Sequence, residues 1–310
     1  MTNLIVGGTG LIGGHLAEYF FKEGEISKGI FRKGSHLKIM DQCGVQCLEA
    51  DLNDRNTLHE PLDMVEAIYN LASPPPTARD EEFAKFGKGL NNLLEEANEH
   101  GVKTFVHLSC LDVYGNTGPI TDRTVPNPKD GYQRAKLDAE NTVIAFGQKN
   151  PDLKMRVVRA ARVVGPRDKT ITVPILRMAE SGKVLLPREA SKPMALSHPK
   201  DLAQALLRAA SYSGGIQSVL VKSFDASLEE YSKAILAASS KKAEIKQAGL
   251  MSGKTIIPEY AQGQIRALRT IGNQDSWSKM GFAPSYTVQR TAEEVSEWLR
   301  KDPWATKDLE

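Results

Sequence analysis

The chain has 310 residues, of which 41% are hydrophobic and 25% charged, so it has enough apolar material for one large globular domain or two interleaved ones. Forty basic residues against 38 acidic ones leave a net charge of +2, which excludes the large field that draws proteins to nucleic acid or to an acidic membrane surface. We therefore expect a small-molecule ligand, recognised by a local site.

The cysteines predict a reduced, cytoplasmic protein. Cys43, Cys47 and Cys110 are an odd number of thiols, and neither a signal-peptide pattern nor a long apolar span accompanies them. Cys43 and Cys47 are close in sequence, but no second pair of cysteines or histidines completes a metal site. We expect ordinary thiols and no metal.

Strands and helices alternate along the first half of the chain. Short apolar runs predict strands at residues 2–6, 26–31, 45–49, 64–71, 103–108 and 153–159. Apolar residues at helical spacing predict helices between most of them, at 11–23, 80–100 and 131–148. This alternation is typical of an α/β fold of the Rossmann type, a doubly wound and mostly parallel sheet.

The second half is less regular. It predicts helices at 174–181 and 200–211, a strand at 216–221 and a final amphipathic helix, which we expect to pack on the first domain. We expect a first domain at residues 1–165 to which 194–222 return, a smaller interleaved C-terminal substrate lobe made of 166–193 and 223–285, and a C-terminal helix and tail at 286–310. A cleft between the lobes is the expected ligand site.

Glycines fill the turn between the first strand and the first helix, where residues 7–13 read GGTGLIG. In this GxxGxxG spacing the first glycine permits a tight bend, the second lets a diphosphate approach the backbone, and the third allows close packing of helix on strand. Free amides and the helix dipole favour an anion there. The turn predicts a dinucleotide site contacted by Gly7, Thr9, Gly10, Leu11, Ile12 and Gly13.

The end of the second strand favours NADP as the cofactor. At this place an acidic side chain holds the ribose 2′-hydroxyl of NAD, whereas a basic one accommodates the 2′-phosphate of NADP. Arg32 and Lys33 stand here, and Arg32 is the better candidate because a guanidinium can grip a phosphate with two hydrogen bonds. The alternative is that both are solvated surface cations, and NAD stays possible.

Tyr132 and Lys136 are four residues apart on a predicted helix and so share one face. Lowering the pKa of a phenol from about 10 to near 7 takes roughly 4 kcal/mol, which a close ammonium and an oxidised nicotinamide can supply in a desolvated cleft. Such a tyrosine passes protons to and from an alcohol oxygen. Tyr286 and Arg290 have the same spacing, but only the first pair follows a strand whose carboxyl end opens onto the ligand.

Further segments carry a whole-chain pattern: EADLND at 49–54, YNLAS at 69–73, LNNLLEEANEHGVKTFVHLS at 90–109, DVYG at 112–115, YQRAK at 132–136, VGPR at 164–167 and SKMGFAP at 278–284. Together with the glycine turn they resemble the extended short-chain dehydrogenase/reductases, often called the NAD-dependent epimerase/dehydratase family. The resemblance implies a homodimer formed through the helices at 80–100 and 131–148.

The resemblance also implies roles for single residues. Asp51 and Leu52 flank the adenine, Tyr132 is the acid and base, and Lys136 orients the nicotinamide ribose. The segment beside the nicotinamide comprises Leu71, Ala72 and Ser73. Each role has a structural alternative: Asp51 can simply cap the next helix, and Ala72 can be small because the chain turns there.

The chain departs from the family at the substrate. A serine or threonine that hydrogen-bonds the substrate oxygen is replaced by Cys110, a weak donor, and the adjacent Ser109 points to the other side of a strand. Leu111 replaces a dehydratase aspartate and cannot transfer a proton, which disfavours dehydration. We expect substrate contacts from Asp112, from Arg162, which stands where nucleotide-sugar enzymes often have asparagine, and from His198, which can instead start a helix beside Pro199.

Three functions remain open. The first is an NADP-dependent epimerase or reductase of a nucleotide-linked sugar, in which Tyr132 moves the hydroxyl proton. The second is an NADPH-dependent reductase of a small ketone or aldehyde, favoured by the lost sugar-nucleotide positions. The third is a sensor that binds NADP without catalysis, against which the retained pair of Tyr132 and Lys136 argues.

Overall fold

The computed structural model describes residues 1–115, 118–215, 218–248, 255–267, 269–272 and 276–302. Within these residues, seven strands form one parallel sheet in the order β10, β6, β5, β4, β1, β2, β3. The strands are β1 (Thr2–Val6), β2 (Ile26–Phe31), β3 (Gln46–Glu49), β4 (Ala67–Asn70), β5 (Thr104–Cys110), β6 (Lys154–Ala160) and β10 (Ser218–Val221). The expected Rossmann-type α/β fold is confirmed.

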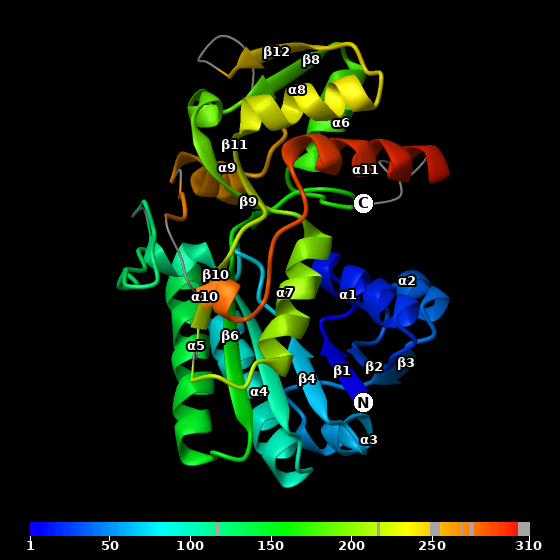
Figure 1. The fold of residues 1–310 in the computed structure, drawn as a ribbon, viewed down its shortest axis with the longest axis vertical. Coiled ribbons are helices and arrows are strands. Elements are labelled where there is room, and N and C mark those ends of the chain that lie inside the picture. The colour runs from blue at the N-terminus through cyan, green and yellow to red at the C-terminus, as the bar shows by residue number, and fades with distance from the viewer. Residues whose placement is uncertain (116–117, 216–217, 249–254, 268, 273–275, 303–310) are drawn as a thin grey trace.

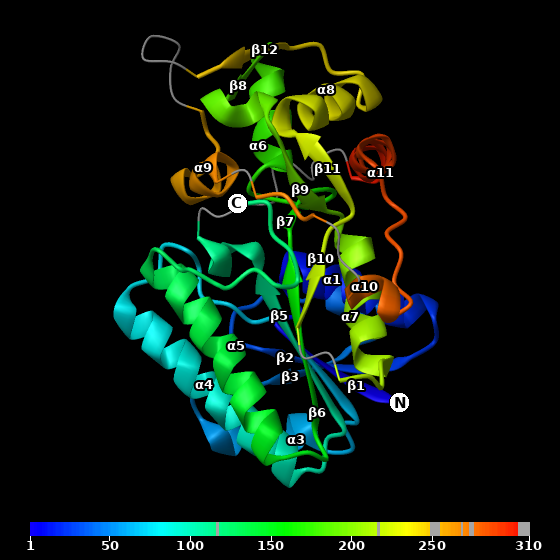
Figure 2. The same cartoon turned by 60° about the vertical axis from the view of Figure 1, so that its left-hand side comes forward.

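Helices cover both faces of this sheet (Figures 1 and 2). One face carries α1 (Leu11–Lys22), α2 (Lys38–Gln42) and α7 (Pro199–Ser211), and the other carries α3 (His59–Leu62), α4 (Asp80–Glu99) and α5 (Gly131–Lys149). Both faces need covering because successive residues of a strand point to opposite faces of the sheet, and β1 carries apolar side chains on each. Ile5 packs with α1 and α7, whereas Leu4 and Val6 pack with α4 and α5.

The smaller lobe stands above the carboxyl ends of the strands (Figure 1). It holds a three-stranded sheet of β7 (Arg162–Val163), β9 (Pro193–Ser197) and β11 (Phe224–Ser227), and a pair of β8 (Lys183–Leu186) and β12 (Glu244–Gln247). Its helices are α6 (Thr172–Glu180), α8 (Leu228–Ala238), α9 (Glu259–Arg266) and α11 (Val288–Lys301). The chain enters and leaves this lobe more than once, since α7 and β10 lie with the large sheet and α10 (Ser276–Lys279) contacts β10.

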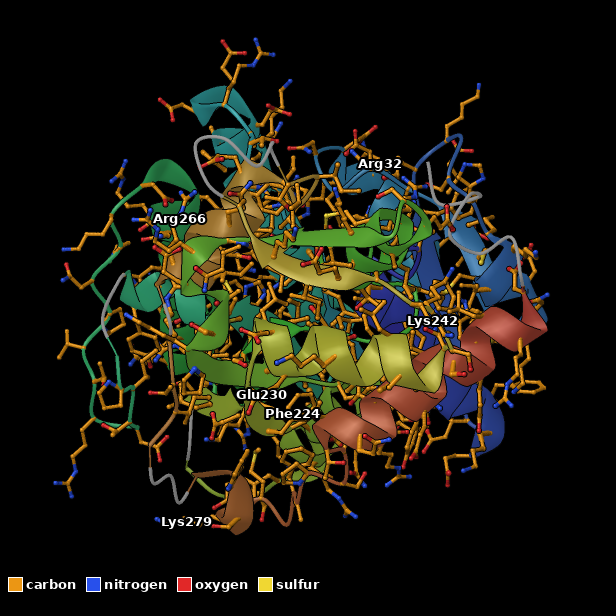
Figure 3. All side chains as sticks on the ribbon, turned by 90° about the horizontal axis from the view of Figure 1, so that it is seen from above. Arg32, Phe224, Glu230, Lys242, Arg266 and Lys279 are labelled. Atoms are coloured by element: carbon orange, nitrogen blue, oxygen red, sulfur yellow. The ribbon has the colours of Figure 1, made fainter. Side chains whose placement is uncertain are left out.

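The final helix does not pack where its pattern predicted. The apolar stripe of α11 lies along α8 of the small lobe, where Ala292 and Val295 join the core around Tyr231 and Ile235 (Figure 3). The expected packing on the first domain is therefore wrong. The helical spacing predicts which face of α11 is buried, but it does not indicate which element packs against that face. The tail at 303–310 lies outside the described residues.

Strand boundaries differ where the backbone turns. The strand expected at 64–71 begins only at Ala67, because Met64 adopts a φ of 57°, which ends extended structure. In the neighbouring strand, β5 continues to Cys110, two residues beyond the expected strand. This extension carries Ser109 and Cys110 to the edge of the sheet that faces the small lobe.

Candidate active site

The glycine turn between β1 and α1 has the close contacts that its spacing predicted. Gly7 has a φ of 86°, and a Cβ atom there would lie 2.9 Å from the amide nitrogen of Ala72. A Cβ on Gly13 would lie 2.5 Å from the Gly7 carbonyl oxygen and 2.5 Å from Cα of Gly8. Only glycine at both positions lets the helix start lie this close to the strand, which leaves a bare backbone cradle above it.

A cavity of about 1610 Å³ runs from this turn to the small lobe. It brings together most of the predicted site residues, namely Thr9, Gly10, Leu11, Ile12, Leu71, Ser73, Ser109, Cys110, Asp112, Tyr132, Lys136 and Arg162. Gly7, Gly13 and Ala72 lie in the packed turn beneath it. The predicted cofactor turn and the predicted acid/base pair thus share one space.

The residues expected around the adenosine, Arg32, Lys33, Asp51 and Leu52, are not among those that line the cavity. Arg32 and Lys33 are exposed directly after β2. The following loop turns back, with the Ser35 amide donating to the Arg32 carbonyl at 3.0 Å, and places Ser35, His36 and Lys38 in the cavity wall. The sequence did not predict these three as site residues, because the prediction of the cofactor rested only on the residues directly after the strand.

Asp51 and Leu52 follow β3. The carboxylate of Asp51 accepts from the Asn53 amide at 2.9 Å, and Leu52 packs against Gly89 of α4. The 3-10 helix η1 (Arg55–Leu58) that follows is capped by Asp54, which accepts from the Asn56 amide at 3.2 Å. Asp54, and not Asp51, is therefore the N-cap of this helix.

Tyr132 and Lys136 project from the first turns of α5. The helix is capped by Asp130, whose carboxylate accepts from the Gln133 amide at 2.8 Å. The phenol of Tyr132 hydrogen-bonds with the side chains of Ser73 and Cys110. The ammonium of Lys136 donates to the Leu108 carbonyl oxygen at 2.9 Å.

Burial dominates the electrostatics of the pair. Burial raises the pKa of Tyr132 well above its ordinary value, and Cys110 and Asp112 act in the same direction. Burial also lowers the pKa of Lys136 and raises the pKa of Cys110 to about 12, so the thiol is protonated at neutral pH. The expected lowering of the phenol pKa requires an oxidised nicotinamide beside the pair and stays a prediction.

A buried polar network holds Asp112 on the substrate side, in the 3-10 helix η2 (Leu111–Tyr114). Its carboxylate accepts from Arg269 at 2.5 Å and from the Gln264 amide at 2.6 Å. Gln264 in turn accepts from Arg162 at 2.6 Å, and Arg162 lies 3.9 Å from Asp168. No local pattern signals Gln264 and Arg269, because they lie 152 and 157 residues from Asp112 in sequence.

Residues 3–219 match the sequence profile of the NAD dependent epimerase/dehydratase family. The chain belongs to this family. The match covers the large sheet with its glycine turn and the helix that carries Tyr132 and Lys136, so the resemblance in the sequence motifs is confirmed.

Relatives of the family share the fold and differ in substrate. The sterol demethylase protein B of Methylococcus capsulatus is 30% identical over 176 residues, which is 54% of this chain and 53% of that protein. The chain spans about half the length of the curated relatives it matches. A UDP-glucose 4-epimerase from Thermotoga maritima, solved with UDP-glucose, has a TM-score of 0.80 at 19% identity, covering 97% of this chain and 99% of that one. A dTDP-glucose 4,6-dehydratase from Bacillus anthracis, solved with NAD, has a TM-score of 0.80 at 18% identity over 100% of both chains.

In this member of the epimerase/dehydratase family both candidates for the serine position reach the cavity wall. Cys110 is half-buried, and Ser109 is buried with its hydroxyl making no hydrogen bond to any residue in the described ranges. Cys43, Cys47 and Cys110 are all free thiols. None of the described helices is long and apolar enough to span a bilayer.

His198 does not reach the cavity, which corrects the expected substrate contact. Its side chain is fully buried, its Nδ1 accepts from the Lys200 amide at 3.2 Å, and its ring stacks on Tyr286 with centroids 3.6 Å apart. It is the N-cap of α7, the alternative that the sequence left open. Burial lowers its pKa to about 3, so the folded protein holds it neutral.

The buried His198 makes stability fall with acidification. The unfolded chain takes up a proton below about pH 6.5 and the folded chain does not, which costs about 1.4 kcal/mol by about pH 5.5. In His198→Asn the cap acceptor remains and the proton linkage is lost. Between about pH 7.5 and about pH 5.5, the free energy of unfolding from urea titrations should fall by about 1.4 kcal/mol more in the wild type than in the variant. Parallel pH profiles would contradict this assignment.

Proposed function

We propose that the protein is an NADP-dependent oxidoreductase or epimerase of a nucleotide-linked sugar, in which Tyr132 exchanges the hydroxyl proton while hydride passes between the sugar carbon and the nicotinamide. The observation that carries the proposal is the single cavity, which joins the glycine turn to Tyr132 and Lys136 and then to the small lobe. The retained acid/base pair argues against a sensor without catalysis.

The glycine turn fits a dinucleotide. Thr9, Gly10, Leu11 and Ile12 line the cavity at the start of α1, and the missing side chains of Gly7 and Gly13 let this helix start pack closely on the strand beneath. A bound nicotinamide supplies the hydride acceptor or donor and, when oxidised, a positive charge. Lys136 orients the ribose, and its release from the Leu108 carbonyl would let the ammonium act on Tyr132.

Arg32, together with Ser35, His36 and Lys38, supports NADP over NAD. A 2′-phosphate beside Arg32 gains charge-assisted hydrogen bonds that a 2′-hydroxyl does not. In Arg32→Ala the dissociation constant for NADPH should therefore rise about tenfold or more, while that for NADH stays unchanged. Calorimetric titration of both coenzymes measures this, and an equal effect on both would remove Arg32 from the phosphate site.

The proton chemistry rests on Tyr132 and its neighbours. With its pKa raised by burial, the phenol is protonated at neutral pH and is poised to donate to a carbonyl oxygen. Cys110, which hydrogen-bonds the phenol, occupies the place of the family's serine or threonine and offers the substrate oxygen only a weak donor. Ser109 carries a stronger donor one residue away.

The size of the cavity supports a large substrate. Pockets for single small ligands commonly measure about 300–1,000 Å³, so about 1610 Å³ leaves room for a dinucleotide and a second extended ligand. Asp112 and Arg162 lie on the side of the small lobe, where the sugar would bind. Leu111 offers no proton there, which favours epimerisation or reduction over dehydration.

A second candidate is an NADPH-dependent reductase of a small, uncharged ketone or aldehyde. The observation that favours it is that Arg162 and Arg269 are already held by Asp168, Gln264 and Asp112, which leaves less positive charge for a diphosphate. The 30% identity to a sterol demethylase protein points in the same direction.

Thermal unfolding separates the two candidates. With NADPH saturating, UDP or dTDP at about 100 times its dissociation constant should add about 2.7 kcal/mol of stability if the small lobe binds a nucleoside diphosphate. A further rise in the unfolding temperature supports the nucleotide-linked sugar. Unchanged unfolding with every nucleoside diphosphate, together with NADPH oxidation by small carbonyl compounds, supports the second candidate.

We also propose that α4 and α5 pair with the same helices of a second copy, as the family resemblance implies. The two helices lie side by side on the outer face of the large sheet (Figure 2). A cytoplasmic location likewise stays a prediction from the thiols.

A further inference from the structure

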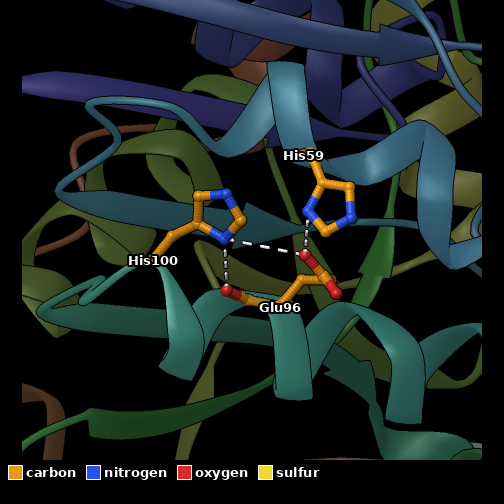
Figure 4. A group of neighbouring side chains, drawn as sticks. All are labelled: His59, Glu96 and His100. Atoms are coloured by element: carbon orange, nitrogen blue, oxygen red, sulfur yellow. Dashed lines mark hydrogen bonds and ion pairs between the residues drawn. The ribbon is translucent and has the colours of Figure 1, made fainter.

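We propose that His59, Glu96 and His100 form a binding site for one divalent transition-metal ion of the zinc type. The three side chains meet between α3 and the last turn of α4 (Figure 4). None of them lines the large cavity, so the site is separate from the proposed hydride-transfer chemistry and does not depend on it. The sequence predicted no metal, because its ligands come from two segments with no cysteine pair.

The three ligand atoms lie at spacings that suit one ion. Nδ1 of His59 lies 2.9 Å from Oε2 of Glu96, Nδ1 of His100 lies 3.6 Å from the same oxygen, and all three ligand atoms lie within 4.8 Å of one another. Two atoms about 2.1 Å from a tetrahedral zinc ion lie roughly 3.4 Å apart. The cluster therefore needs only a small inward turn of His59, whose side chain is 57% exposed.

Glu96 supplies the observation that points to a cation. Its side chain is fully buried, and one oxygen, Oε1, accepts from Arg55. The other oxygen, Oε2, accepts no hydrogen bond in the described part of the chain, although two imidazole nitrogens face it. A buried carboxylate oxygen without a donor is costly, and an ion held with the two imidazoles would satisfy it.

His100 can bind an ion through Nδ1 without leaving the Glu96 carbonyl oxygen unpaired. Its Nδ1 donates to the Glu96 carbonyl oxygen at 2.9 Å, and that oxygen also accepts from the His100 backbone amide at 2.9 Å. When Nδ1 binds an ion, the backbone bond remains and the ring proton moves to Nε2. The spacing of Glu96 and His100, one helical turn apart, puts both on the same face of α4.

The surrounding charge favours a cation. Arg55 is bound by Glu95 at 2.9 Å and by Glu99 at 2.5 Å as well as by Glu96, so three carboxylates surround one guanidinium. The site also lies at the carboxyl end of α4, where the helix dipole attracts positive charge. Two imidazoles and one carboxylate, with a fourth position open to water, form a donor set that suits zinc.

A bound ion would tie the segment of η1 and α3 to the end of α4. This segment follows Leu52, whose carbonyl already accepts from Asn92 of α4 at 2.8 Å. The ion would add to this bond and to the ion pairs that Arg55 of η1 makes with Glu95, Glu96 and Glu99 of α4. Its effect is on stability, since a ligand that binds only the folded state raises the free energy of unfolding.

Zinc binding to the metal-free protein tests the proposal. The full chain, dialysed against a chelator, is titrated with zinc sulfate in competition with a chromophoric chelator. We expect one zinc ion per chain, and at least about tenfold weaker binding in both His59→Gln and His100→Gln. His36→Gln is the matched control, because it removes another exposed histidine, and it should bind as the wild type does.

Two further measurements sharpen the outcome. Zinc should raise the unfolding temperature of the wild type and of His36→Gln, but it should leave that of His59→Gln unchanged. Zinc binding should also weaken on acidification, because imidazole ligates a metal only when it is neutral. His59 is exposed, so its variant is expected to fold, which circular dichroism checks. The proposal is overturned if the wild type binds no zinc, if His59→Gln binds it as tightly as the wild type, or if His36→Gln loses it.

Discussion

We expect Tyr132→Phe to lower turnover by about 10²- to 10⁴-fold and to leave the dissociation constant for NADPH within about twofold, because in the proposed reaction the change removes only the proton that the phenol exchanges. The ring stays in place beside Ser73 and Cys110, so the cofactor turn is not disturbed. NADPH oxidation measured by absorbance, with coenzyme affinity from calorimetry, checks both parts. Tyr19→Phe, a matched change on α1 outside the cavity lining, should retain full turnover.

The direction of the reaction should respond to pH through the same residue. Because burial raises the pKa of Tyr132, the protonated phenol prevails at neutral pH and assists carbonyl reduction, whereas alcohol oxidation needs the phenolate and speeds up as pH rises. This pH dependence should disappear in Tyr132→Phe. Turnover of Tyr132→Phe at the wild-type rate would show that another group moves the proton.

We expect Gly13→Ala to weaken NADPH binding by about a hundredfold, which is about 2.7 kcal/mol, and to lower the free energy of unfolding by about 1–3 kcal/mol. The new methyl group would lie 2.5 Å from the Gly7 carbonyl oxygen and 2.6 Å from that of Gly8, and both are backbone atoms that cannot rotate away. The turn must open, which displaces the amides that face the diphosphate. Calorimetry with NADPH and urea unfolding measure the two effects.

Gly87→Ala is the control for this change. Gly87 also lies inside a helix, α4, but no atom lies within 4 Å of the added Cβ. The substitution should stabilise the protein by about 0.5–1 kcal/mol and leave NADPH binding unchanged, because alanine loses less backbone entropy than glycine in a helix. If Gly13→Ala behaved like Gly87→Ala, close packing at the turn could not be the reason for its glycine.

The parts of the fold that the sequence predicted are those encoded over short distances. The spacing of the glycines lies within seven residues and that of Tyr132 and Lys136 within five, although the close contact of Gly7 is with the distant Ala72. The spacing of the pair also needed its place after a strand, because Tyr286 and Arg290 have the same spacing. The alternation of strands and helices predicted the sheet because each element carries its own apolar pattern.

Contacts between distant segments had no such signal. Asp112 depends on Gln264 and Arg269 from beyond residue 260, and α11 packs on α8, which no pattern within α11 indicates. The burial that raises the pKa of Tyr132 and the Leu108 carbonyl that accepts from Lys136 also have no signal in the helical spacing of the pair.

The path of the chain between the two sheets decides how the protein can be divided. A fragment that ended at residue 165 would lack α7 and β10, whose Leu202, Leu206 and Val219 cover one face of the large sheet. It would present β6 as an open edge strand beside an uncovered apolar surface, the combination that promotes aggregation. We therefore expect residues 1–165 to aggregate when they are separated from the rest of the chain.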